Sequence, residues 1–201
     1  MNNLTCKNDN ESILNMKLRW FITLAVITAA LLIFKGFIAE QLFNRATSYY
    51  GFAMPKDAIR EYKKVVLLNP DNEEALNWLG HSYFKSGKMH KAKDILKKAI
   101  KLNPYNYFAC LDLGLIYVRE GELQKAKDVF YKISLTKPDE SNTQESYLRD
   151  YKNCLHWLGR VEIDLGETDE AIQTYKKILD FYPDDKGAKN QLNKILNNRG
   201  R

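Results

Sequence analysis

The chain has 201 residues, a formal net charge of +6 and hydrophobic residues at 45% of its positions, so it can form one folded domain with a continuous core. Its three cysteines form no CxxC pair and no metal-ligand spacing, and the chain contains no phosphate-binding loop and no nucleophile motif. We therefore expect neither an enzyme, nor a metal site, nor a cofactor.

The first predicted element is an apolar segment near the N-terminus. Residues 20–34 carry no charge, and the segment continues past Lys35 to residue 39. A helix of this length measures about 30 Å, which matches the hydrocarbon core of a bilayer. We predict a polar tail over 1–19 and a transmembrane signal-anchor helix over 20–39. A helix buried in a soluble core is the alternative.

The flanks of this segment predict its processing and its orientation. Phe37, two positions before Ala39, fits poorly with the small-x-small pattern of a signal peptidase site, so we expect an uncleaved anchor. Lys17 and Arg19 precede the segment, and the positive-inside rule keeps such a tail in the cytoplasm. The rest of the chain would then lie on the extracytoplasmic, periplasmic side of a bacterial inner membrane. The cytoplasmic face is the alternative, because basic residues also follow the segment.

The region after the anchor is predicted to be a stack of helical pairs. No proline interrupts residues 20–50, so we expect the anchor to continue into the first helix of this stack as one rod. Three prolines and three alanines then recur at intervals of 34 residues, namely Pro70, Pro104 and Pro138, and Ala58, Ala92 and Ala126. A fixed period of this length is typical of a solenoid, in which each unit must stack on its neighbours to bury its apolar face.

Two units carry a specific residue pattern. One contains Leu76, Leu79-Gly80, Tyr83, Ala92, Leu96 and Pro104, and the next contains Cys110, Leu113-Gly114, Tyr117, Ala126, Phe130 and Pro138. This pattern resembles the tetratricopeptide repeat (TPR). The resemblance implies an all-α, TPR-type helical solenoid over 40–198, with about four repeats at 39–72, 73–106, 107–140 and 152–185. The first repeat is degenerate at its start, and in the last repeat Glu162 replaces the expected tyrosine.

An insertion separates the last two repeats. Residues 141–151 add 11 positions, close to three helical turns, so an insert within a helix rotates the downstream stripe by only about 20°. We predict a long helix from about Thr143 to Leu165, with Tyr147 and Tyr151 on its apolar stripe and a cap at Ser141–Gln144 or Asn142–Glu145. A loop is the alternative. Residues 187–198 are predicted to form a C-terminal capping helix.

The resemblance also implies a partner-binding groove, formed by the first helices of the repeats. It places there Asn77, His81, Phe84 and Lys85 from the second repeat, Phe108, Leu111, Leu115 and Arg119 from the third, and His156 and Arg160 from the fourth. We expect the run Phe108, Leu111 and Leu115 to be exposed and to bind an apolar peptide or helix between cationic side chains. The alternative is that the long helix or the C-terminal cap covers this run.

These expectations define a function. We predict a membrane-anchored protein–protein interaction scaffold whose groove binds a peptide or helix of a partner, in a membrane-associated assembly, secretion or biogenesis complex. A self-associating homo-oligomer that organises a membrane patch is the alternative. Nucleic acid is not an expected partner, because no aromatic residues interleave the lysines of residues 85–101. Cys110 is expected to be a core residue and not to form a disulfide with Cys154.

Overall fold

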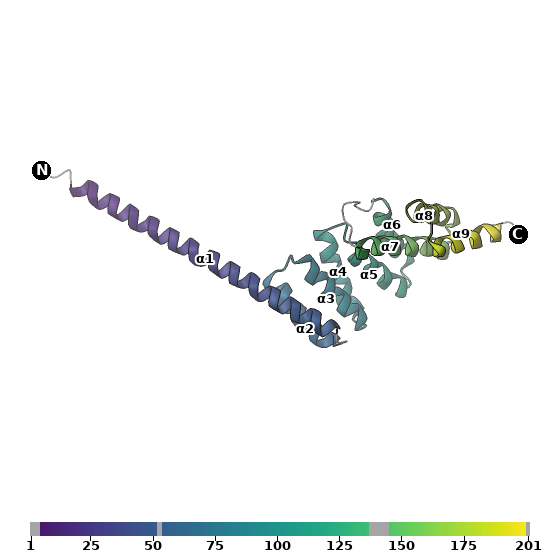
Figure 1. The fold of residues 1–201 in the computed structure, drawn as a ribbon, viewed down its shortest axis with the longest axis horizontal. Helices are drawn as coiled ribbons and strands as arrows, with labels where there is room; N and C mark the ends of the chain where they lie inside the picture. Colours follow the sequence, from purple (N-terminus) through teal and green to yellow (C-terminus); the bar gives the residue numbers. More distant parts are fainter. Residues whose placement is uncertain (1–4, 52–53, 137–144, 200–201) are drawn as a thin grey trace.

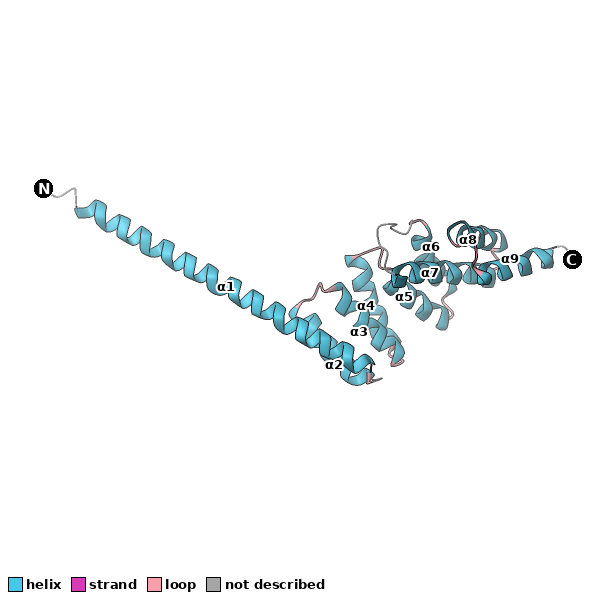
Figure 2. Ribbon diagram, in the orientation of Figure 1, coloured by secondary structure: helices cyan, strands magenta, loops and turns pink. Residues whose placement is uncertain are grey.

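A computed structural model describes residues 5–51, 54–136 and 145–199, and these residues form nine α-helices and no strand (Figures 1 and 2). In chain order the helices are α1 (Thr5–Gly51), α2 (Pro55–Leu68), α3 (Glu73–Lys85), α4 (Met89–Leu102), α5 (Tyr107–Arg119), α6 (Leu123–Ser134), α7 (Glu145–Asp164), α8 (Thr168–Phe181) and α9 (Lys186–Arg199). The all-α prediction is confirmed.

The helices pack as four successive pairs. α1 packs on α2, α3 on α4, α5 on α6 and α7 on α8, while α2–α3, α4–α5 and α6–α7 contacts join each pair to the next. α9 packs on α8 at the end of the array. The stacked pairs share one apolar core, as predicted for a solenoid whose units are too small to fold alone.

Glycines bring the two helices together in the second, third and fourth pairs. A Cβ atom at Gly80 would lie 2.6 Å from Leu96 Cδ2, and one at Gly159 would lie 2.8 Å from Tyr175 Cζ. At Gly114 the ring of Phe130 occupies the space that a Cβ would need. The periodic glycines are therefore required by packing, because larger side chains would separate the paired helices.

Asparagines fix the start of the first helices in the second and third repeats. Asn72 accepts a hydrogen bond from the backbone N–H of Ala75, and Asn106 caps α5 in the same way. The Asn106 amide also donates to Glu73 Oε1 and to Asn77 Oδ1, both at 2.8 Å. These contacts tie the beginning of α5 to α3 and set the position of one repeat on the next.

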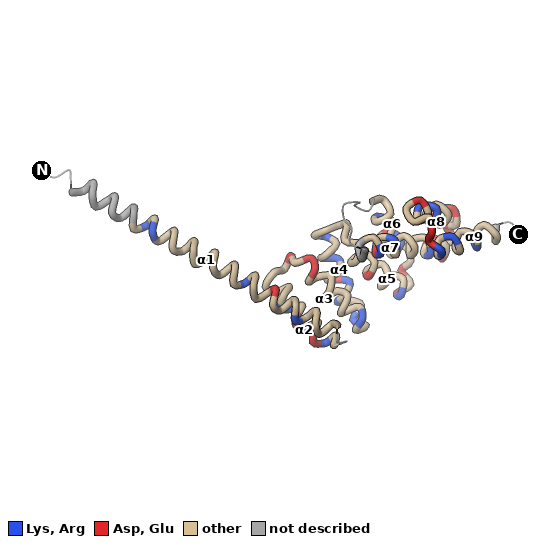
Figure 3. The backbone as a smooth tube through the Cα atoms, in the orientation of Figure 1, with Lys and Arg blue, Asp and Glu red and all other residues tan. Residues whose placement is uncertain are grey.

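Helix α1 is one uninterrupted helix of 47 residues, which confirms the predicted rod. Its C-terminal part packs on α2, whereas its N-terminal part extends away from the array (Figure 1). The stretch Met16–Gly51 is long and apolar enough to cross a membrane, with a mean hydropathy of 2.3 over its most apolar 18 residues. Figure 3 shows few charges along the coloured part of this helix and many on the repeats.

The predicted long helix after the insertion is confirmed for its described part. α7 has 20 residues, and Tyr151 at its start is fully buried, with its ring 5.2 Å from that of Tyr107 and its hydroxyl donating to the Thr136 carbonyl. The loop alternative is therefore wrong from Glu145 onward. The capping pairs predicted at 141–145 and the Tyr147 side chain lie outside what the structure describes.

Candidate functional site

The first helices of the repeats form one surface, which we call the first-helix face: the C-terminal part of α1 together with α3, α5 and α7. His81 of α3 lies near its middle and contacts both neighbouring helices. Its Nδ1 lies 2.6 Å from Asp112 Oδ2 of α5, and its Nε2 lies 2.8 Å from the Tyr50 hydroxyl of α1. Because a carboxylate only accepts, Nδ1 donates to Asp112, and Nε2 shares a hydrogen bond with the Tyr50 hydroxyl.

The environment of Tyr50 shifts the pKa of its side chain. Burial and the nearby negative charge of Asp112 both raise the pKa of the Tyr50 hydroxyl. Both ring nitrogens of His81 are thus engaged by the protein. The imidazole is held as a structural link across three helices, with no nitrogen left to act on a bound molecule.

Aromatic rings surround this link. Trp78 lies 5.1 Å from Tyr50 and 5.5 Å from Phe108, measured between ring centroids, and Phe108 lies 5.2 Å from His81. We call Tyr50, Trp78, His81 and Phe108 the aromatic cluster. All four are partly exposed, so the cluster presents an amphipathic surface whose rings are held in place by hydrogen bonds and by one another.

Negative charge lies beneath the cluster. Asp112 is buried, and Asp150 at the start of α7 is also buried, 3.4 Å from the Arg149 guanidinium. Burial raises the pKa of the Asp150 carboxyl, and the charge of Asp112 raises it further. Positive charge lies at the far end of α3 and α5, where Lys85 is exposed and the Arg119 guanidinium lies 4.8 Å from the ring centroid of Phe84.

The structure divides the ten predicted groove residues into groups. Asn77, His81 and Phe108 lie together at or beside the aromatic cluster. Phe84 is buried under Arg119, and Lys85 is exposed nearby. Phe108, Leu111 and Leu115 are each partly exposed, and the two leucines also pack against the core, so the binding role expected of this run stays a prediction.

His156 and Arg160 lie apart from the cluster. They line a small cavity of about 200 Å³ between α7 and α9, together with Trp157 and Gly187. His156 pairs with Asp185 at 3.0 Å, so its ring is already engaged, whereas Arg160 lies over the Trp157 ring. The groove predicted through the last repeat stays a prediction.

A larger cavity of about 550 Å³ lies between α4, α5 and α6, lined by Cys110, Leu113, Tyr117 and Val129 among others. Cys110 offers no nucleophile there, because burial raises the pKa of its thiol to about 12. Cys154 is also buried and unpaired. Within the three described segments, no group of three or more His, Cys, Asp or Glu side chains is arranged to hold a metal ion.

Sequence reasoning missed Tyr50, Trp78 and Asp112. Trp78 and Asp112 occupy equivalent positions in successive repeats, 34 residues apart, and this position was not assigned to the groove. A bulky aromatic residue and a carboxylate at one repeat position form an unusual combination in a helix whose neighbouring positions are core residues. That combination was the signal that could have identified them.

Profiles of known protein families match the chain at its repeats. Profiles of the tetratricopeptide repeat match residues 73–106, 109–139 and 153–185, and a TPR repeat profile matches residues 56–87. Among curated proteins, none matches the chain significantly.

Solved structures share the fold. A crystal structure of MamA is 30% identical, with a TM-score of 0.59, and the match covers 71% of this chain and 77% of that one. A second crystal structure of MamA is 28% identical, with a TM-score of 0.66, covering 82% and 84%. MamA from Desulfovibrio magneticus RS-1 is 16% identical with a TM-score of 0.64, covering 81% and 86%, and so shows a likeness of fold alone.

Proposed function

The chain belongs to the tetratricopeptide repeat family, and from this premise we propose that it is a membrane-anchored scaffold that binds a peptide or helix of a partner protein across its first-helix face. Repeats of this kind generally serve as protein-interaction scaffolds, because stacking produces one extended surface from many helices. The partner would belong to an assembly, secretion or biogenesis complex at the membrane.

The aromatic cluster is the single observation that carries the binding proposal. Trp78 and Tyr50 are the residue types that contribute most to protein interfaces, and here they are partly exposed side by side. The hydrogen bond of Tyr50 and the ring contacts of both residues fix them before a partner arrives, so little conformational entropy is lost on binding. An apolar or aromatic partner side chain fits this surface, and Lys85 and Arg119 favour carboxylates next to it.

The exposed part of α1 supports the anchor. Its large apolar side chains are between 54% and 74% exposed, with Trp20 and Ile33 among the most exposed, and no described helix covers them. A continuous apolar surface of this kind is unstable in water but stable in lipid. We place the repeats outside the cytoplasm, because Lys17 and Arg19 flank the N-terminal end of the apolar stretch.

Site-specific photo-crosslinking in intact membranes tests the binding surface. A benzoylphenylalanine at Lys85 on α3 should give a discrete adduct, a benzoylphenylalanine at Lys63 on the exposed side of α2 should give none, and Trp78→Ala should abolish the Lys85 adduct. Equal adducts at both positions, or an adduct that survives Trp78→Ala, would contradict the assignment. An adduct of twice the chain's mass would instead support the self-associating scaffold.

A protease-accessible tag after Arg201 tests on which side of the membrane the repeats lie. In cells with a permeabilised outer barrier, external protease should remove the tag if the repeats lie outside the cytoplasm. Protection of the tag, with an internal cytoplasmic marker also intact, would place the repeats on the cytoplasmic face.

A further inference from the structure

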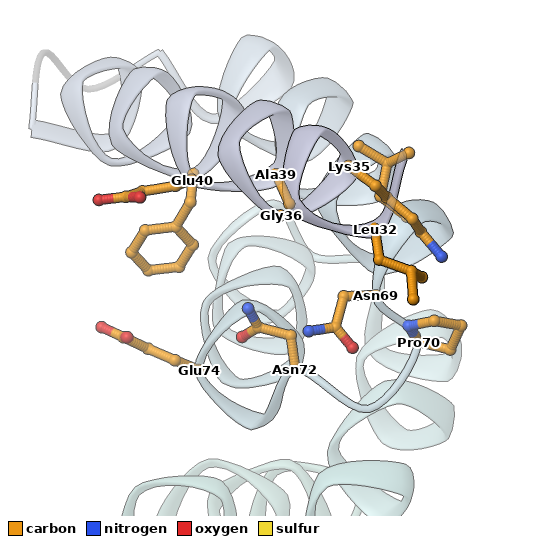
Figure 4. A pocket seen from close by; sticks show the side chains of 11 residues that line it. Leu32, Lys35, Gly36, Ala39, Glu40, Asn69, Pro70, Asn72 and Glu74 are labelled. Atoms are coloured by element: carbon orange, nitrogen blue, oxygen red, sulfur yellow. The ribbon is translucent and has the colours of Figure 1, made fainter. Parts of the chain in front are cut away.

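An open cleft lies where α1 leaves the repeats, at the junction between the proposed anchor and the first repeat. Its volume is about 450 Å³, and Figure 4 shows α1 on one side and the turn from α2 into α3 on the other. We call it the anchor cleft. It lies more than two helical pairs away from the cavity between α7 and α9, and none of its lining residues belongs to the aromatic cluster.

Small residues of α1 keep this cleft open. A Cβ atom at Gly36 would have nothing within 4 Å, and one turn later Ala39 is the first buried residue of the stretch Met16–Gly51. The side chains of Asn69 and Asn72 lie opposite these two residues (Figure 4). Asn72 is engaged in capping α3, whereas the Asn69 amide is exposed at the mouth.

The charges of the cleft are separated along its length. Lys35 lies at one end, beside Leu32 and Pro70, and the carboxylates of Glu40 and Glu74 lie at the other (Figure 4). Among the residues that the structure describes, none forms an ion pair with Lys35, Glu40 or Glu74. The cleft therefore offers an unpaired cation and two unpaired carboxylates to a ligand.

This order of charges is matched to the membrane boundary. Residues 20–34 are uncharged, and Lys35 is the first charge after them, about one helical turn before the end of the predicted span at residue 39, so its ammonium can extend to the phosphate level. Glu40 follows five residues later, about 7 Å farther along the helix axis. Moving outward from the membrane, the cleft thus presents an apolar wall, then a cation, then two carboxylates.

We propose that the anchor cleft binds the headgroup of a phospholipid that ends in a primary ammonium. The lipid phosphate would accept hydrogen bonds from the Lys35 ammonium and the Asn69 amide, and the lipid ammonium would donate to Glu40 and Glu74. One acyl chain would lie along Leu32. A headgroup that carries a phosphate but no amine leaves both carboxylates unneutralised beside it and is disfavoured. This inference rests on the proposed membrane anchoring.

Native mass spectrometry of the full chain, purified in detergent and exposed to equal amounts of phosphatidylethanolamine and phosphatidylglycerol, tests the site. The chain should retain phosphatidylethanolamine about fivefold better, since one charge contact at a membrane surface contributes about 1 kcal/mol. Glu40→Gln combined with Glu74→Gln should abolish the preference, and Lys35→Ala should weaken retention of both lipids. Lys63→Ala and Asp180→Asn, at exposed positions outside the cleft, should change neither.

Equal retention of both lipids by the unmodified chain would overturn the site, as would a preference that survives the double glutamine variant. Thermal unfolding checks that the variants keep their fold. Extraction of membranes with alkaline carbonate distinguishes a missing lipid site from a chain that is not inserted in the membrane at all. A chain that stays in the membrane but shows no lipid preference contradicts the cleft alone, whereas a chain released by carbonate contradicts the anchor and the cleft together.

Discussion

The two halves of α1 share one helical backbone but have opposite surroundings. In the N-terminal half, Trp20 and Ile33 are 73% and 74% exposed. In the C-terminal half, Ala46 is completely buried against α2. The comparison teaches that a helix acquires its environment from its side-chain pattern, because the backbone hydrogen bonds are the same in both halves.

The pattern changes at Ala39. Before it, apolar residues occupy every side of the helix, which no single partner helix could cover. From it onward, Ala39, Phe43, Ala46 and Tyr50 follow one another at spacings of four, three and four, which places them on a single stripe facing the repeats. One part of the helix is therefore apolar on all sides, whereas the other presents a single apolar stripe to a protein neighbour.

The largest expected effect comes from a charge in the packed half. Ala46→Arg places a guanidinium where α1 and α2 leave no space, and we expect it to lower the free energy of unfolding by about 4 kcal/mol. Membrane insertion should be unaffected. Thermal unfolding of the detergent-purified chain, followed by circular dichroism, measures the loss. An unchanged midpoint would show that α1 does not pack on α2 as described.

The same substitution in the exposed half should have the opposite pair of effects. Ala30→Arg introduces the charge near the middle of the apolar stretch, which costs about 3 kcal/mol of membrane insertion. No repeat contacts this position, so the unfolding midpoint should not move. Carbonate extraction and thermal unfolding together measure the two effects. Retention in the membrane at the level of the unmodified chain would contradict a spanning role.

The packed half of α1, unlike the exposed half, is also joined to α2 by an ion pair. Arg45 donates to Glu61 at 2.6 Å, and Glu61 is buried. Burial alone would raise the pKa of Glu61, but hydrogen bonds from Lys64, Arg45 and Arg60 lower it from 4.5 to about 2. Because the folded-state pKa lies below the ordinary value, this carboxylate stabilises the fold above about pH 4.5, and the stabilisation is lost as the pH falls toward 2.

Removing one hydrogen-bond donor to Glu61 should change how the stability depends on pH. Arg45→Ala should lower the free energy of unfolding at neutral pH by about 1 kcal/mol, since the guanidinium is half exposed and partly screened by solvent. The acid-induced loss of stability should still begin near pH 4.5, but it should be smaller and complete at a higher pH, because the folded-state pKa of Glu61 rises toward its ordinary value. Urea unfolding at a series of pH values measures both changes. Lys63→Ala, on the same helix as Glu61 but without a contact to it, is the control.

The fold was predictable because the residues that determine it recur at a fixed interval in the sequence. The interval of 34 residues, the glycines between paired helices and the length of the insertion each depend on residues near one another in sequence. The binding surface was only partly predictable, because the aromatic cluster takes Tyr50, Trp78 and Phe108 from three positions that are not equivalent in the repeats. The engagement of His156 by Asp185 depends on how α9 closes the array, which no repeat pattern encodes.

The smallest expected effect tests the point where the two halves of α1 meet. Gly36 lies within a continuous helix, and a methyl group there would contact nothing within 4 Å. Gly36→Ala should therefore stabilise the local helix by about 0.5 kcal/mol, because alanine loses less backbone entropy on folding. Slower amide exchange across residues 34–44 in detergent, measured by mass spectrometry, is the expected result.

The matched substitution Gly80→Ala should act in the opposite direction, although it makes the same chemical change within a helix. Its new methyl group would lie 2.6 Å from Leu96 Cδ2, so the leucine must move and α3 must separate from α4. Amide exchange should then become faster in α3 and α4. If Gly36→Ala also accelerated exchange, the helix would bend at Gly36 in solution, and the rod that carries the repeats away from the membrane would be a hinge.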